Sequence, residues 1–203
     1  MGFMDLFRRR PQIRDPDALA AFIDSNAAFL VQKGIYEYSR ARAGHYSKVL
    51  FAEPEFRDAV ERSRWQAYPL GLAMVTEMIE GILRADVDDR RVALDTLAAL
   101  TLSVFDRYPV PAPLGAAAWS DARSELAHRL DLIGTHAVKP AKDIPVPFAD
   151  SYFALMPIHE KLRASERPTI TNYLRVTMCN IHDEFTRRMD RPALAQMLRA
   201  GPG

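Results

Sequence analysis

Residues 88–106 read DDRRVALDTLAALTLSVFD, and this stretch decides the fold of the chain. Asp88 and Asp89 can cap the start of a helix, and the apolar residues that follow occupy every side of a helical wheel. They are Val92, Leu94, Leu97, Leu100, Leu102, Val104 and Phe105. A helix that is apolar all round has to be buried all round. The stretch therefore predicts the central helix of an all-α, compact multi-helix bundle of about eight to nine helices.

Prolines and glycines divide the rest of the sequence into segments of helical length. No segment shows the period-two alternation that predicts a half-buried strand. Gly34 is expected to end or weaken the first helix, and Pro157 to kink or restart the helix around it. The helix over 69–84 is amphipathic, and its polar strip contains Thr76, Glu77, Glu80 and Arg84. The expected helices span residues 15–33, 35–51, 54–66, 69–84, 88–106, 120–134, 148–164, 168–189 and 192–200.

The same punctuation predicts one domain with two less regular segments. Residues 1–14 are expected to form a flexible basic leader, and residues 15–135 the main helical bundle. Residues 136–147 contain three prolines and predict a Pro-rich connector or hinge. Residues 148–200 are expected to form C-terminal helices that pack on the same core.

Composition and charge exclude several classes of protein. The chain has 27 basic and 26 acidic side chains, and its formal net charge of +1 gives no electrostatic footprint for nucleic acid. DNA is therefore not an expected partner. A single cysteine excludes an internal disulfide, and no stretch approaches the run of about 18 apolar residues that a spanning helix needs. We expect a cytoplasmic protein.

The first ten residues carry apolar side chains followed by arginines. A secretory signal has the opposite order and a longer apolar stretch. Contact with a membrane surface is an alternative, but ten residues are short for a stable interfacial helix, and we favour a frayed leader. The residues that would make the membrane contact are Phe3, Leu6, Phe7, Arg8, Arg9 and Arg10.

Two helical families resemble parts of the chain. Residues 27–38 are similar to the start of TetR-type regulators, but there is no room between Gly34 and Tyr36 for the remaining helices of a helix-turn-helix. The length, the all-α character and residues 46–54 resemble redox-enzyme maturation chaperones of the TorD type. The Glu-Pro-x-Asp-His motif of those chaperones is absent, so the chain is assigned to neither family.

Metal-binding and catalytic motifs are incomplete. Glu125 and His128 have the Glu-x-x-His spacing of di-metal bundles, but the pair occurs once and lies opposite the predicted core stripe of its helix. Cys179 and His182 supply two ligands, which do not make a zinc site. The sequence also lacks a nucleophile elbow and a glycine-rich phosphate loop. We therefore predict no metal site and no catalytic residue, and no particular cofactor is indicated.

Several polar residues fall on the apolar stripes of predicted helices, where they would be buried. A buried arginine has to be paired, and a buried amide or imidazole has to be hydrogen-bonded. One interpretation is a structural network in which Arg42 pairs with a carboxylate such as Glu80 or Glu160. The other is a pocket for an anionic or polar small molecule, lined by Asn26, Tyr38, Arg42, His45, Tyr152 and His159.

These features favour a non-catalytic helical binding protein, which would be an adaptor, assembly factor or regulator that acts through apolar helix faces. The missing catalytic motifs, the large apolar faces and the eight methionines favour this interpretation. The expected partner is a second copy of the chain in a homodimer, or another protein. The alternative is a small-molecule-binding protein or enzyme, in which Arg42 would clamp an anion and His45 or His159 would transfer a proton.

Overall fold

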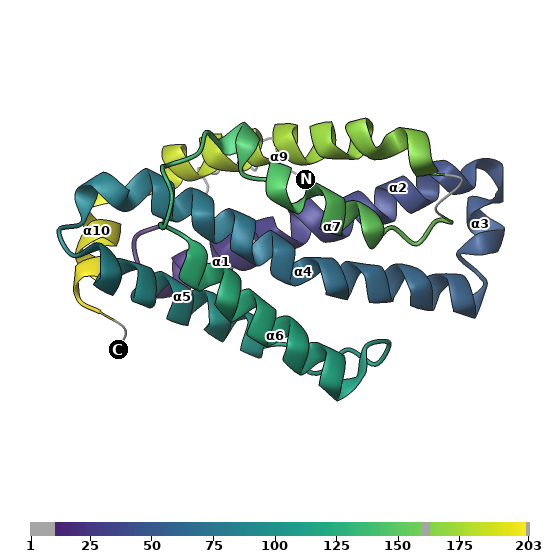
Figure 1. Ribbon diagram of the computed structural model, residues 1–203, viewed down its shortest axis with the longest axis horizontal. Helices are drawn as coiled ribbons and strands as arrows, with labels where there is room; N and C mark the ends of the chain where they lie inside the picture. The colour runs from purple at the N-terminus through teal and green to yellow at the C-terminus, as the bar shows by residue number, and fades with distance from the viewer. Residues whose placement is uncertain (1–10, 160–162, 202–203) are drawn as a thin grey trace, which may run out of the picture.

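The computed structural model describes residues 11–159 and 163–201 as helices joined by short connections (Figure 1). The all-α prediction is confirmed, and the one β-type pairing within these ranges is an isolated bridge between Ile13 and Met189. The proposed membrane-contact residues Phe3, Leu6, Phe7, Arg8, Arg9 and Arg10 lie outside them. The α-helices are α1 Pro16–Ala28, α2 Gly34–Ala43, α3 Ser47–Leu50, α4 Pro54–Leu83, α5 Arg90–Asp106, α6 Gly115–Leu132, α7 Ala149–Ala154, α9 Arg167–Arg188 and α10 Arg191–Arg199.

Helix α4, and not the predicted helix 88–106, is the most enclosed helix of the bundle. Every residue from Ala67 to Glu80 is buried. Helix α5, which covers most of the predicted central helix, exposes Arg91, Ala99 and Ser103 along one side. Apolar residues occupy every side of α5 although the helix is not buried on every side. Several of its leucines lie at the edges of its contacts with other helices and are only half-buried. These leucines are Leu94, Leu100 and Leu102.

The predicted helices 54–66 and 69–84 form one continuous helix. Pro69 lies inside α4, although a proline within a helix costs about 3 kcal/mol through a lost hydrogen bond and a clash with the preceding turn. Burial of the segment after Pro69 offsets this cost, because each Å² of apolar surface removed from water contributes about 25 cal/mol. The predicted helix 148–164, in contrast, stops at Ala154, before Pro157.

The chain does not end a helix at Gly34, because α1 continues through a π-helical turn, η2 Phe29–Lys33, into α2. The irregular turn lies directly before Gly34, where a weak point was the other expectation. A π-turn interrupts the regular hydrogen bonding of a helix. The hydroxyl of Tyr152 in α7 donates to the Val31 carbonyl at 2.8 Å. A methyl group at Gly34 would lie 2.5 Å from this hydroxyl, so glycine makes room for the contact.

The beginning of the described chain is attached to its C-terminal part. Ile13 is fully buried, and its N–H donates to the Arg188 carbonyl at 2.9 Å. The Ile13 carbonyl accepts a hydrogen bond from the Asp190 N–H at 2.8 Å. Residue 13 of the expected leader 1–14 is therefore held to the C-terminal part of the chain by two backbone hydrogen bonds.

The proline-rich segment 136–147 packs against the bundle. It contains two short 3-10 turns, η5 Ala141–Asp143 and the first two residues of η6 Val146–Phe148. Ile144 between them is buried. Arg175 of α9 donates to the Lys142 carbonyl at 3.1 Å, so the segment is attached to α9 and forms one side of the bundle.

We expect Tyr152→Phe to lower the free energy of unfolding by about 0.5–1.5 kcal/mol, because the buried hydrogen bond from its hydroxyl to the Val31 carbonyl is lost while the Gly34 N–H still donates to that carbonyl. Urea denaturation followed by circular dichroism measures the change. Tyr46→Phe is a matched control that removes an exposed hydroxyl, with an expected effect within about 0.5 kcal/mol. Equal stability of the two variants would contradict the role given to Tyr152.

Candidate functional site

Two of the six predicted ligand-binding residues are satisfied by backbone carbonyl groups. Tyr152 is buried and donates to Val31, as described above. The side-chain amide of Asn26 donates to the Phe22 carbonyl of its own helix at 2.9 Å. Both residues therefore have a structural hydrogen-bond partner without any ligand.

Arg42, His45 and His159 are exposed, which corrects the prediction that they belong to an interior cluster. On the predicted helix 35–51, the positions of the large apolar side chains indicated a buried stripe that includes Arg42. The structure instead buries the small residues Ser39 and Ala43, because small side chains let α2 pack directly on α4. The buried stripe of α2 is therefore rotated by one residue from its predicted position.

Arg42 pairs with a glutamate, as the structural interpretation expected, but this glutamate is neither Glu80 nor Glu160. Arg42 Nη1 lies 2.8 Å from Oε1 of Glu166, in the turn η7 Ala164–Glu166 before α9. Because the Arg42 side chain is 39% exposed, this pair is of the kind that contributes about 0–1 kcal/mol. Glu80 pairs elsewhere, and Glu160 lies outside the described residues. Ligand binding by the six residues stays a prediction.

Tyr38 lies beside this ion pair and is half-buried. Burial, together with the negative charge of the Glu166 carboxylate, raises the pKa of its hydroxyl to about 12. The positive charges of Arg42 and Arg163 act in the opposite direction. The structure thus brings Tyr38 and Arg42 together around Glu166, at the surface rather than in the core.

Two carboxylates of α4 are buried, and the sequence suggested a buried role for only one of them, Glu80. Glu77 and Glu80 belong to the polar strip of this helix, yet both are buried. Glu77 lies 2.8 Å from Nζ of Lys139 and 3.6 Å from Nε2 of His136. Both partners come from the segment after α6, which covers the strip. The signal in the sequence was two glutamates three residues apart in a strongly apolar helix, and no local pattern shows what covers them.

Glu80 forms a two-pronged ion pair with Arg84, in which its oxygens lie 2.8 Å from Nε and 2.6 Å from Nη2. Arg90 of α5 lies 3.4 Å from the same carboxylate and donates to the Gly134 carbonyl. Gly134 has a φ of +88°, and a methyl group there would lie 2.7 Å from Arg90 Nη2, so this position favours glycine. The ion pairs therefore join α4, α5 and the segment after α6.

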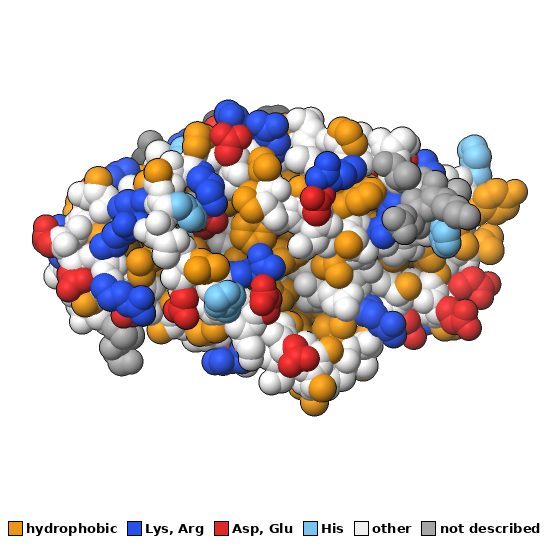
Figure 2. All heavy atoms as spheres, in the orientation of Figure 1, with side chains coloured by type: hydrophobic (Ala, Val, Ile, Leu, Met, Phe, Trp, Pro, Cys, Tyr) orange, Lys and Arg blue, Asp and Glu red, His pale blue; other side chains and the backbone are white. Residues whose placement is uncertain are grey.

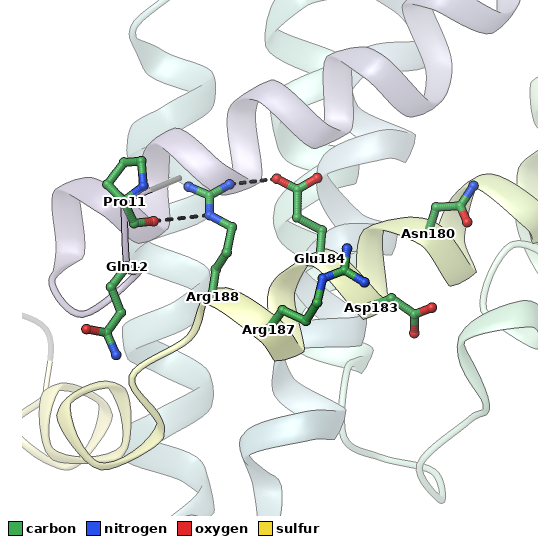
Figure 3. A pocket seen from close by; sticks show the side chains of 7 residues that line it. All are labelled: Pro11, Gln12, Asn180, Asp183, Glu184, Arg187 and Arg188. Carbon is green, nitrogen blue, oxygen red and sulfur yellow. Dashed lines mark hydrogen bonds and ion pairs between the residues drawn. The ribbon is translucent and has the colours of Figure 1, made fainter. Parts of the chain in front are cut away.

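A wide polar hollow lies beside the end of α9 (Figure 3). Its volume is about 1130 Å³, and its lining residues are Pro11, Gln12, Asn180, Asp183, Glu184, Arg187 and Arg188. Arg188 is already engaged, since it donates to the Pro11 carbonyl at 3.1 Å and pairs with Glu184 at 2.6 Å. Gln12, Asn180 and Asp183 point in different directions in Figure 3. The hollow has no converging polar groups, and none of the six predicted ligand-binding residues lines it.

A second surface, which we call the α3 corner, consists of Tyr36, Tyr46, Val49 and Phe51. Tyr46 is 73% and Val49 59% exposed, the two highest values among the large apolar side chains that the structure describes. Three of its four residues follow Gly44 in the sequence, and Gly44 ends α2 with a φ of +52°. Figure 2 shows apolar side chains projecting at the end of the molecule where Figure 1 places α3.

Ring contacts hold the base of the α3 corner. The ring centroids of Tyr36 and Phe51 are 5.2 Å apart, and those of Phe51 and Phe56 are also 5.2 Å apart. No residue from 44 to 49 is buried. Folding therefore gains little from the apolar character of Tyr46 and Val49, and clustered exposed apolar side chains of this kind are typical of a binding surface.

Three further findings bear on function. The described residues contain no group of three or more His, Cys, Asp or Glu side chains that could hold a metal ion. Within the same part of the chain, no helix combines the length and the apolar character needed to cross a membrane. Comparison of the chain with protein-family models, curated proteins and solved structures finds no match.

We expect Glu80→Gln to lower the free energy of unfolding by about 3 kcal/mol, because it leaves the guanidinium groups of Arg84 and Arg90 beside a neutral amide. Urea denaturation measures the change. Asp95→Asn is the control, because its ion pair with Arg91 is well exposed and its loss should cost less than about 1 kcal/mol. A similar cost for both variants would contradict a structural role for the buried pair.

The raised pKa of Tyr38 predicts that the protein loses stability at alkaline pH. Its pKa is near 10.0 in the unfolded chain and rises to about 12 in the folded one, so the unfolded state releases its proton first. The contribution is complete below pH 10 and is lost as the pH rises toward 12. Urea midpoints measured over this range should fall less steeply in Tyr38→Phe than in the unchanged protein. Parallel curves would show that Tyr38 does not contribute.

Proposed function

We propose that the protein is a non-catalytic cytoplasmic binding protein, an adaptor, assembly factor or regulator, that docks onto a protein partner through the α3 corner. The observation that carries this proposal is the exposure of Tyr46, at the end of the 3-10 turn η3 Gly44–Tyr46, and of Val49, on the short helix α3 that follows. Tyrosine is enriched at the centres of protein interfaces, because its ring buries a large apolar area while its hydroxyl keeps a hydrogen-bonding group.

The ring contacts at the base of the α3 corner support its role as a docking surface. Tilted and edge-on ring contacts between Tyr36, Phe51 and Phe56 connect its base to α2 and α4. A partner would therefore meet a surface that is already ordered, and less conformational entropy is lost on association. An apolar area on a rigid support is what a binding surface requires.

Charged side chains near the corner in sequence make a protein partner, including a second copy of the chain, suitable. Arg40 and Lys48 are exposed, and so are Glu53 and Glu55. None of the four forms an ion pair with any residue that the structure describes. Figure 2 shows acidic side chains beside the apolar ones at this end of the molecule. In a two-fold homodimer, the basic side chains of each copy are available to pair with the acidic side chains of the other.

The test compares the full chain with the double variant Tyr46→Ser/Val49→Ser. Light scattering measures the mass of the purified protein, and cross-linking in the lysate of its own cells followed by mass spectrometry identifies captured partners. We expect the double variant to lose self-association or partner capture. Its free energy of unfolding should change by no more than about 0.5 kcal/mol, because both side chains are exposed.

Val110→Ser/Val146→Ser is the matched control, since both valines are exposed and lie outside the α3 corner. This control should associate as the unchanged protein does. A wild-type chain that is strictly monomeric and captures no partner would overturn the proposal. Retention of the same partner by the corner variant would also overturn it.

A further inference from the structure

A groove lies at the end of α4 away from the α3 corner, between α4, the segment 138–144 and the end of α9. Its volume is about 560 Å³, which is within the range of about 300–1,000 Å³ typical of small-molecule sites. Met78 and Ile82 of α4 form one apolar wall, and Val138 and Ile144 form another. Figure 1 shows α3 and α10 at opposite ends of the molecule, and the groove is on the α10 side.

Two of the four apolar side chains of this groove are only partly covered by folding, whereas Met78 and Ile144 are buried. Val138 is 51% exposed, and Ile82 is half-buried. A methyl group at Gly81 would lie 3.1 Å from Cγ1 of Val138, so the segment rests directly on the backbone of α4 at that point. The segment is thus held against the helix at Gly81, and the groove beside this contact stays open.

Three nitrogen-bearing side chains line the same groove, and each is held by a carboxylate. Lys139 Nζ lies 2.8 Å from Glu77, and Nδ1 of His182 lies 3.3 Å from Asp183. Arg191 pairs with Asp86 through Nη1. These contacts fix the positions of the side chains before any ligand arrives, which lowers the cost of binding.

Two of these side chains keep hydrogen-bonding atoms available. Arg191 uses Nη1 for Asp86 and for the Ile82 carbonyl, while its Nε and Nη2 donate to no residue that the structure describes. Nε2 of His182 also contacts no residue that the structure describes, since the described contact is through Nδ1, and it is a donor in the protonated imidazolium. Guanidinium and imidazolium N–H groups are suitable donors to carboxylate and phosphate oxygens.

We propose that this groove binds a small amphipathic anion, with its apolar body against Ile82 and Val138 and its carboxylate or phosphate on Arg191 and His182. The apolar body would cover wall surface that folding leaves in water. The anionic group would take the unused donors of Arg191 and His182. This site is separate from the α3 corner, so the two proposals stand or fall independently.

The test titrates the full chain with hexanoate and hexyl phosphate, and with hexanol and inorganic phosphate as the two halves of the ligand. Isothermal titration calorimetry measures each affinity. We expect at least one of the two amphipathic anions to bind about tenfold or more tightly than either half, since an ion-paired head group of this kind contributes about a factor of ten. The better of the two identifies the head group as carboxylate or phosphate.

Three variants locate the binding. Thr186→Trp fills the groove from α9, and the Thr186 hydroxyl bonds only to the His182 carbonyl of its own helix at 2.9 Å, so we expect binding to be lost while the protein stays folded. Thr171→Trp is the matched control, because Thr171 makes the same bond to Arg167 at 2.9 Å and does not line the groove. His182→Phe should weaken anion binding and leave hexanol binding unchanged.

The proposal is overturned if neither amphipathic anion binds, or if hexanol or phosphate alone binds as tightly. It is also overturned if Thr186→Trp, folded by circular dichroism, binds as the control does. Should Thr186→Trp fail to fold, His182→Phe decides, because an unchanged affinity for the anion in that variant excludes the proposed head-group site.

Discussion

The burial of two carboxylates on the most enclosed helix constrains the rest of this bundle. Removing an ionised carboxylate from water costs several kcal/mol, and the cost is met only by well-placed cations. Glu80 receives one of them from Arg84 on its own helix and another from Arg90 on α5. Glu77 receives Lys139 from the segment after α6. The proline-rich segment lies against α4 where these contacts require it.

The same requirement shapes the surfaces available for binding. The middle of α4 is enclosed on every side, so no partner can reach it without unfolding the bundle. Its two ends differ. At one end the segment held by Lys139 forms the wall of an apolar groove, and at the other the chain turns at Gly44 and presents Tyr46 and Val49 to water. Binding surfaces therefore occur at both ends of the helix whose centre supports the core.

Local sequence signals located most helices, and they failed where distant contacts overrode them. Asp-Pro at 15–16 and Glu-Pro at 53–54 correctly marked the starts of α1 and α4. The helix ends predicted at Gly34 and before Pro69 are absent, because Tyr152 packs on the π-turn beside Gly34 and surrounding helices bury the turn around Pro69. The α3 corner was not predicted, since residues 35–51 were expected to form one helix and Gly44 ends it.

The sequence by itself determined that the chain is helical, where most of its helices lie and that its polar residues include some that need a partner. Only the tertiary structure decided which residues those are. Arg42 was expected inside and is exposed, whereas Glu77 and Glu80 belong to a polar strip and are buried. A helical wheel gives the direction in which a side chain leaves the axis of its own helix. Whether that direction leads to water or to another helix depends on segments far away in the sequence.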